Sequence, residues 1–394
     1  MTPGARVAAA IAVLDAIIAG APAERALTNW ARGARYAGSG DRAAVRDHVF
    51  DALRRLRSCA ALGGGEDGRA VMLGSLRSQG IDPEGIFTGA GHAPAPLSEA
   101  ERRAGRLPTE AEARDLPDWI WPYFEAALGE AAPAAAEALR QRAPVTLRVN
   151  VRRITCARAQ AELAGEGIAT QPVSDINNAL QVTNNERKIS RSRLYAAGLV
   201  ELQDASSQAA MEAIDLPAGA RVLDFCAGGG GKVLALAARH DGTWFAHDAD
   251  PHRMADLPAR ARRAGVAVRL CTMEELAARG PFDAILCDVP CSGSGTWRRA
   301  PQARWTLVPE RLHDLARLQG EILARAAALL APEGVLIYTT CSVFVQENED
   351  VIGHFLRENA AFGVSRMRRW PISATGDGFF LAQLRRATWK DGQP

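Results

Sequence analysis

The chain has 394 residues, 47% of them hydrophobic, which is enough for two or three domains with at least one sizeable core. Its formal net charge at pH 7 is only +2, so any surface that binds nucleic acid must be a local patch. The seven cysteines include no Cys-x-x-Cys pair and no apolar run reaches the roughly 18 residues of a membrane span, so we expect no disulfide framework, no metal site and no membrane segment.

The N-terminal part is predicted to be helical. Apolar residues recur at helical spacing over residues 7–18, 24–30 and 42–62. The apolar start imitates a secretory signal, but Asp15 interrupts it early and only Arg6 precedes it, so we prefer an amphipathic first helix. The cysteine usage fits a reducing compartment, and we expect a cytoplasmic protein.

The middle of the chain changes character several times. Residues 89–117 are rich in glycine, proline and charge, which indicates a linker or a variable insertion. The predicted elements that follow are helices over 117–142, a strand over 146–151, a helix over 156–165 and a strand over 179–183. A basic cluster then suits phosphate contacts, although such a run is also typical of solvated surface; it consists of Arg187, Lys188, Arg191 and Arg193.

From residue 204 onward, short β-rich runs alternate with alanine-rich helical stretches. The runs are 221–225, 243–247, 266–270, 284–287 and 335–340. This alternation predicts an α/β fold with a mostly parallel, doubly wound sheet, whose ligands bind at the carboxyl ends of the strands.

A glycine-rich loop follows the first of these strands directly, in the stretch from Asp224 to Lys232. Its four consecutive glycines permit positive φ angles and a close approach of the backbone to a ligand. A strand, a glycine turn and a helix together predict a cradle for a nucleotide-type cofactor.

Two cysteines stand at the ends of two later strands, Cys291 in the stretch 288–293 and Cys341 in the stretch 339–342. Thiolates are good and reversible nucleophiles, and an electron-poor ring can be alkylated at carbon only after a nucleophile has added to it. The other five cysteines are interpreted as small core residues or, for Cys226, as lining of the glycine loop.

Together these stretches resemble the RsmB (Fmu/Sun) family of RNA cytosine carbon-5 methyltransferases. The family motifs read Asp-x-Cys-Ala-Ala-Pro-Gly-Gly-Lys, Asp-Ala-Pro-Cys-Ser-Gly and Ala-Thr-Cys-Ser. The matching stretches in this chain occur in the same order, and two further matches flank them; the five are 203–208, 224–232, 288–293, 340–342 and 376–380. The resemblance covers most of the chain.

The resemblance implies a class I Rossmann-like methyltransferase core over residues 204–394, preceded by a small α/β RNA-binding module over 117–203. Residues 1–116 would be a helical domain plus linker, because the charged stretch from Asp41 to Arg57 resembles the NusB-like domain that opens many members. That domain is abbreviated here and loses its pattern after the glycines at 63–65. A plain helical interaction module is the alternative.

The cofactor implied is S-adenosylmethionine. Its expected contacts are Cys226, Ala227, Gly228, Gly229, Gly230, Gly231, Lys232, Asp248, Thr272 and Asp288. Asp248 ends the second strand, where a carboxylate can accept hydrogen bonds from both ribose hydroxyls. Two positions depart from the family: Gly229 replaces a proline, which makes the free loop floppier, and Thr272 stands where an aspartate contacts adenine, with Glu274 as a substitute if the register slips.

The family roles assign Cys341 as the nucleophile that adds to carbon 6 of cytosine. Asp288 would hydrogen-bond the ring at nitrogen 3 and the exocyclic amine, and Cys291 would assist release of the enzyme after methyl transfer. Removal of the carbon 5 proton then requires a base near the ring.

The expected RNA contacts are the basic cluster and a loop that joins an aromatic residue to arginines, Trp297, Arg298 and Arg299. Such a loop suits stacking on a splayed base, because a duplex would hide carbon 5 and carbon 6.

We therefore expect methylation of RNA, most simply ribosomal RNA. The alternatives are the same chemistry on transfer RNA, or an RNA-binding assembly factor whose catalytic core has decayed.

Overall fold

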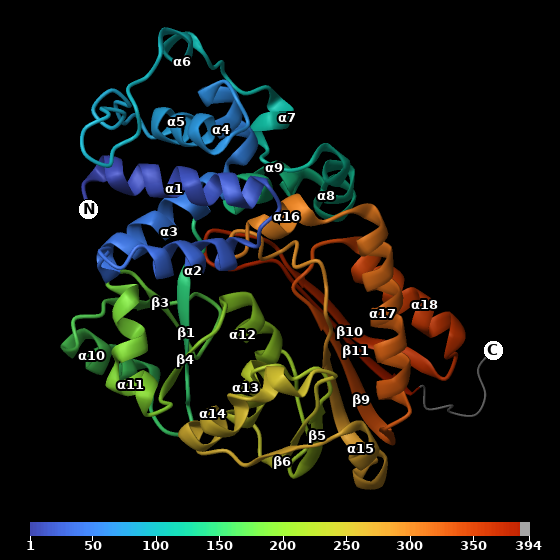
Figure 1. The fold of residues 1–394 in the computed structure, drawn as a ribbon. Helices are drawn as coiled ribbons and strands as arrows, with labels where there is room; N and C mark the ends of the chain where they lie inside the picture. Colours follow the sequence, from blue (N-terminus) through green and yellow to red (C-terminus); the bar gives the residue numbers. More distant parts are fainter. Residues whose placement is uncertain (387–394) are drawn as a thin grey trace. The chain divides into compact units, whose positions relative to one another are not determined.

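The computed structural model describes residues 1–386, which form two compact units (Figure 1). The helical unit comprises Met1–Arg142 and Trp297–Thr306, and the α/β unit comprises Ala143–Thr296 and the chain from Leu307 onward. Residues 117–142, grouped by sequence with the following sheet, lie in the helical unit. The domain limits at residues 116 and 203 stay predictions.

The helical unit has a core to which α1 to α5 contribute apolar residues. Its helices are α1 (Pro3–Ile18), α2 (Ala23–Gly33), α3 (Ser39–Arg54), α4 (Leu56–Gly63), α5 (Gly68–Ser78), α6 (Glu99–Arg103), α7 (Glu110–Ala113), α8 (Trp121–Leu128), α9 (Ala132–Leu139) and α16 (Gln302–Thr306), with 3₁₀ turns η1 (Asp118–Ile120) and η2 (Gly129–Ala131).

Close contact between α4 and α5 explains why the sequence pattern ended after residue 63. A Cβ atom on Gly63 would lie 1.8 Å from the carbonyl oxygen of Ala70, and one on Gly74 would lie 1.8 Å from that of Cys59. The two helix backbones therefore touch, which only glycine permits. These glycines mark helix packing rather than the end of a domain.

Two predictions for this unit need correction. The helix predicted over 42–62 is two helices, α3 and α4, separated at Arg55. The stretch predicted as a linker over 89–117 contains α6 and α7, whose capping boxes begin at Ser98 and Thr109.

The segment 297–306 leaves the α/β unit and fills the interior of the helical unit. The ring of Trp297 stacks on that of Phe124, with centroids 6.0 Å apart. The fully buried Arg304 donates to the carbonyl oxygens of Asp115 and Leu139, each at 3.0 Å. These contacts satisfy a guanidinium group that would otherwise be costly to bury.

This burial corrects two expected RNA contacts. The side chains of Trp297 and Arg298 are each 1% exposed, so neither can stack on a base or reach a phosphate. The aromatic and basic pattern that suggested RNA binding is instead explained by packing and by hydrogen bonds such as that from Arg54 Nε to the carbonyl of Arg298, at 2.7 Å. Of the three residues, only Arg299 is exposed.

The α/β unit opens with a four-stranded antiparallel sheet in the order β2-β3-β1-β4. Its elements are β1 (Val145–Val149), α10 (Cys156–Gly165), β2 (Thr170–Pro172), β3 (Ala179–Val182), η3 (Glu186–Arg191), α11 (Arg193–Ala196) and β4 (Val200–Leu202). The sequence predicted β1, α10 and β3, but β2 and β4 are only three residues long and give too little alternation to detect.

The larger sheet has seven strands in the order β10-β11-β9-β8-β5-β6-β7. β11 pairs antiparallel with both β9 and β10, and the other neighbouring strands of this sheet pair parallel. The strands are β5 (Ala220–Asp224), β6 (Gly242–Ala246), β7 (Val268–Leu270), β8 (Phe282–Asp288), β9 (Leu330–Thr340), β10 (Phe362–Trp370) and β11 (Phe379–Arg386). The mostly parallel sheet confirms the predicted fold class, whereas the β10–β11 hairpin was not predicted.

Helices cover both faces of this sheet (Figure 1). They are α12 (Ala205–Glu212), α13 (Gly231–Ala237), α14 (Leu257–Ala264), α15 (Met273–Arg279), α17 (Pro309–Ala327) and α18 (Glu349–Glu358), with 3₁₀ turns η4 (Pro251–Met254) and η5 (Val345–Glu347). Successive strand residues alternate between the two apolar clusters, as in Val222 and Leu223 of β5. The parallel strands therefore end at one edge, which carries the candidate site.

We expect Trp297→Ala to lower the free energy of unfolding of the helical unit by roughly 3–5 kcal/mol, because truncation leaves a cavity beside Phe124. Urea denaturation followed by circular dichroism measures the change. The matched control is Thr306→Ala in the same segment, where the side chain is exposed and the expected change is within about 0.5 kcal/mol. Equal stability of the two variants would contradict the packing role of Trp297.

Candidate functional site

The glycine loop joins the end of β5 to the start of α13. Gly228 and Gly230 have φ angles of +48° and +78°, which side chains rarely adopt. Arg260 donates a hydrogen bond to the carbonyl of Gly229, so the position where the family has proline is braced from outside the loop. A Cβ atom at Gly231 would meet nothing within 4 Å. Arg260 therefore holds the loop at Gly229, whereas the space beside Gly231 is open.

Asp248 fastens this loop to the end of the neighbouring strand. Its side chain is buried, Oδ2 accepts a hydrogen bond from the backbone N–H of Gly228 at 2.9 Å, and Oδ1 accepts one from Asp250 at 3.0 Å. Arg253 Nη1 lies 3.3 Å from Oδ2. The carboxylate is thus fixed in place at the carboxyl edge of the sheet.

Asp224 is a polar residue at this edge that the sequence analysis did not select. It ends β5 and is 1% exposed. Burial, reinforced by the charge of Asp288, raises its pKa to about 7, while Lys232 and backbone hydrogen bonds from Val233 and Cys226 act in the opposite direction. A buried acid next to a glycine loop is suited to receive a cationic group of a ligand.

Lys232 and Asp288 form an ion pair beside Asp224. Lys232 Nζ lies 2.5 Å from Asp288 Oδ2 and 5.2 Å from the centroid of the Phe379 ring. Asp288 Oδ1 accepts a hydrogen bond from Thr339 Oγ1 at 3.2 Å. Burial opposes the charge of Lys232, but the attraction of Asp288 prevails and raises the lysine pKa. The pair holds the positive charge of Lys232 beside Asp288, at the end of β8.

The two predicted cysteines come together, with their Sγ atoms 3.4 Å apart and no disulfide between them. The hydrogen bond from Cys291 lowers the pKa of Cys341 against the effect of burial, and Lys232 and Thr296 assist. The same hydrogen bond and burial raise the pKa of Cys291 well above its usual value. Cys341 is therefore the more readily ionised thiol of the pair, and Cys291 the one that more readily keeps its proton.

A buried carboxylate, Glu347, holds the loops that carry these thiols. Its Oε1 accepts hydrogen bonds from the backbone N–H of Ser292 at 2.7 Å and from Gln319 Nε2 at 3.1 Å. Its Oε2 accepts from the hydroxyls of Ser292 and Ser342, each at 2.5 Å. Ser292 follows Cys291 and Ser342 follows Cys341, so one side chain that is 0% exposed fixes both cysteine loops.

The network extends beneath the loops. Tyr338 donates its hydroxyl to the carbonyl of Glu347 at 2.5 Å, and Asn348 accepts from the hydroxyl of Thr340 at 2.6 Å and donates to the carbonyl of Ser342 at 3.0 Å. Sequence reasoning missed Glu347, although a glutamate six residues after a motif cysteine was a usable signal. Its burial could not be read from the chain.

The last family match, 376–380, begins in a loop that contacts Gly295, four residues after Cys291. The N–H of Gly378 donates to the carbonyl of Gly295 at 3.0 Å, and a Cβ atom on Gly295 would lie 2.3 Å from the carbonyl oxygen of Gly378. The two glycine backbones therefore pack directly against each other.

The remaining predicted residues lie in several places. Cys226 and Ala227 begin the glycine loop, as expected from the chain. Thr272 is the N-cap of α15 and accepts a hydrogen bond from the backbone of Glu275, which gives it a structural role; its contact with adenine stays a prediction. Glu274, the substitute considered for that contact, is exposed in the first turn of the same helix.

All four residues of the basic cluster are exposed, on η3 and at the start of α11. Arg193 pairs with Glu166 at 3.3 Å, which reduces its free charge. Among residues 1–386, no helix is long and apolar enough to span a membrane, and no cluster of three or more His, Cys, Asp or Glu side chains has the arrangement of a metal site.

Comparisons with known proteins agree with this geometry. Residues 211–385 match the family model described as 16S rRNA methyltransferase RsmB/F, and residues 116–190 match the ferredoxin-like domain of RsmF/B-like methyltransferases. The chain is 32% identical over 320 residues to the ribosomal RNA small subunit methyltransferase B of Xanthomonas campestris pv. campestris, covering 76% of this chain and 72% of the relative.

Two solved structures share the fold. The crystal structure of PH0851 superposes with a TM-score of 0.78 at 22% identity and covers 98% of this chain and 99% of its own. A methyltransferase homolog protein from Pyrococcus horikoshii superposes with a TM-score of 0.59 at 28% identity and covers 68% of this chain and 94% of its own.

We expect Glu347→Gln to raise the pKa of Cys341 by about one pH unit or more. The carboxylate accepts four hydrogen bonds, and because the NH₂ group of glutamine cannot accept any, at least one donor loses its partner and the two cysteine loops move apart. Iodoacetamide alkylation of Cys341, followed by mass spectrometry from pH 6 to 10, measures the shift. The matched control is Glu349→Gln, whose carboxylate pairs with Arg369 outside the network. An unshifted midpoint in a folded Glu347→Gln variant would remove Glu347 from control of the thiols.

Proposed function

The chain belongs to the RsmB/F family and is an S-adenosylmethionine-dependent RNA cytosine carbon-5 methyltransferase, and on this premise we propose that it methylates small-subunit ribosomal RNA through a covalent adduct on Cys341. The observation that carries the proposal is the pair of thiols 3.4 Å apart, with the acidic member beside the Lys232–Asp288 ion pair. A buried structural cysteine has no need of such an environment.

The residues at the strand ends fit the methyl donor. We expect Asp248 to accept hydrogen bonds from the ribose hydroxyls, the loop of Gly228 to Gly231 permits close approach, and the buried carboxylate of Asp224 suits the ammonium group of the methionine moiety. When bound, S-adenosylmethionine supplies an electrophilic methyl group. A protonated Asp224 would lose its proton as the ammonium group binds, because a positive charge nearby lowers the carboxyl pKa.

The first step is addition of the Cys341 thiolate to carbon 6 of cytosine. A sulfur–carbon bond forms, and the ring electron pair moves to carbon 5, which becomes nucleophilic. The Asp288 carboxylate accepts a hydrogen bond from the exocyclic amine, and from nitrogen 3 once that nitrogen takes up a proton in the adduct; Lys232 and Thr339 hold the carboxylate in place.

The second step releases the enzyme. Once carbon 5 carries its methyl group, loss of its proton to a base returns the electron pair to the ring and breaks the bond to Cys341. Cys291 lies within hydrogen-bond distance of the leaving sulfur and holds a proton at neutral pH, so it stabilises the departing thiolate.

The proposed RNA contacts are the exposed basic cluster on the ferredoxin-like module and, as a separate contact on the helical unit, Arg299. Exposed arginine and lysine side chains contact phosphates without reading sequence, which suits an enzyme that recognises RNA by shape. Trp297 and Arg298 are no longer part of this surface because they are buried.

Bisulfite sequencing of RNA from a strain that lacks the gene tests the choice of substrate. We expect one 5-methylcytosine of small-subunit ribosomal RNA to disappear and the methylation of transfer RNA to stay unchanged. Complementation with the wild-type gene should restore the signal, and complementation with Cys341→Ala should not. Loss of methylation in transfer RNA alone would overturn the ribosomal substrate.

Denaturing gels separate the roles of the two thiols. Cys341→Ala should neither methylate nor form a covalent RNA complex, because it cannot add to the ring. Cys291→Ala should accumulate an RNA adduct that survives denaturation, formed faster at pH 9 than at pH 7, because loss of the donated hydrogen bond raises the pKa of Cys341. The double variant should form none. Accumulation of the adduct in Cys341→Ala instead would reverse the assignment.

A further inference from the structure

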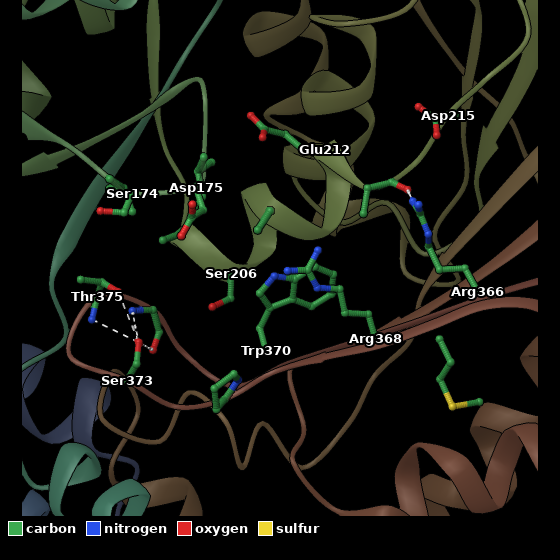
Figure 2. Close-up of a pocket in the computed structure, with 18 residues that line it drawn as sticks. Ser174, Asp175, Ser206, Glu212, Asp215, Arg366, Arg368, Trp370, Ser373 and Thr375 are labelled. Atoms are coloured by element: carbon green, nitrogen blue, oxygen red, sulfur yellow. Dashed lines mark hydrogen bonds between the residues drawn. The ribbon is translucent and has the colours of Figure 1, made fainter.

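A second cavity, distinct from the thiol pair, opens in the α/β unit. It has a volume of about 610 Å³, within the roughly 300–1,000 Å³ typical of ligand sites. The β2–β3 loop, α12, the end of β10 and the segment 371–376 form its walls, and Figure 2 shows their side chains converging on it. None of the proposed cofactor contacts and neither motif cysteine lines it, although Ala205, Ser206 and Gly376 of the flanking family matches do.

An aromatic ring and a guanidinium group stand together in this cavity. Arg368 lies over the ring of Trp370, 4.8 Å from its centroid, and the two are side by side in Figure 2. Trp370 is half-buried and Arg368 is exposed, so part of this surface is accessible from solvent. Ser206, Ser373 and Thr375 line the same cavity, on one side of Trp370 in Figure 2. Stacked aromatic and arginine planes are the usual platform for an unpaired base.

The charges that line the cavity favour a nucleobase over a bare phosphate. Arg366 and Arg368 are opposed by three carboxylates, Asp175, Glu212 and Asp215. Oε1 of Glu212 has no hydrogen-bond donor, although Arg239 lies 3.6 Å away. Carboxylates repel phosphate but accept hydrogen bonds from the exocyclic amines of bases.

The cavity lies close to the catalytic residues. The rings of Trp370 and Phe379 are 6.4 Å apart, and Phe379 contacts Lys232, the partner of Asp288. Trp370 also ends β10 at the same edge of the sheet as the strand ends that carry Asp288 and Thr340. One segment, 371–378, borders both the cavity and the cysteine loop.

We infer that this cavity binds one unpaired nucleobase of the substrate RNA near the target cytosine, stacked on Trp370 and Arg368. The inference rests on the proposed function, because the ligand is part of the substrate. Holding a second base draws the flanking strand out of a helix, which helps to expose carbon 5 and carbon 6 of the target.

The test uses the full chain and single-stranded RNA oligonucleotides around the methylated cytosine, with an abasic site placed at each flanking position in turn. Fluorescence anisotropy measures the dissociation constant for the wild type, Trp370→Ala and Trp370→Phe. We expect one abasic position to weaken binding by the wild type about 5- to 100-fold, and Trp370→Ala to weaken binding of intact RNA similarly. Combining the two should cause no further loss, and Trp370→Phe should restore most of the affinity.

Arg368→Ala replaces Trp370→Ala if the latter lowers the melting temperature. Arg385→Ala is the matched control for Arg368→Ala, because it also removes one positive charge, from an exposed position on the adjacent strand β11, outside the cavity. If the loss of affinity from Trp370→Ala adds to the loss from the abasic site at every position, the nucleobase site is overturned. The proposed function is not affected by that result as long as the wild type binds and methylates the RNA. Failure of the wild type to bind or methylate any RNA would instead overturn the proposed function.

Discussion

The two cysteine loops are held together by one buried carboxylate, which accepts three hydrogen bonds from these loops and a fourth from helix α17. Glu347 is 0% exposed, and every one of its close polar neighbours is a donor. An ionised carboxylate is the one side chain that can accept from all four, so the charge is tolerated in the interior because it is fully hydrogen-bonded. As a result, the two thiols, which lie on loops that follow different strands, are held 3.4 Å apart, where one can donate its hydrogen to the other.

Around those thiols, charge is distributed unequally. Asp224 and Asp288 are close enough to raise the pKa of Asp224, and Lys232 sits between the acids and the sulfur atoms as a compensating cation. The lysine therefore serves the carboxylates and the thiolate at once. Substrate and methyl donor would meet in a region whose electrostatics are fixed before either arrives, which lowers the reorganisation needed during reaction.

Sequence predicted the parts of this site that follow from strand ends and motifs. Cys291 and Cys341 could be placed because each follows a β-rich run, and parallel strands end at one edge. Glu347 could not, since its importance lies in burial and in partners distant in the chain, and the raised pKa of Asp224, which the motif did locate, depends on burial that the sequence does not show. Trp297 misled because an aromatic residue beside arginines describes a buried packing cluster as well as an RNA surface, and only tertiary structure separates the two. The fold class was accessible from the alternation of elements, whereas three-residue strands and glycine-mediated helix contacts were not.

The course of the segment 297–306 restricts the truncations and domain exchanges that the protein can tolerate. The chain passes between its units after residues 142, 296 and 306, so the helical unit is not a detachable prefix. A shortened chain that began at residue 143 would keep Trp297 and Arg304 but lose the interior that contains them, so the aromatic ring would be exposed to solvent and Arg304 would lose its carbonyl partners. Recombination that exchanged only the first 142 residues would have to preserve ten residues encoded far downstream. The two units are therefore expected to be transmitted as a single piece, and their sequences to change together.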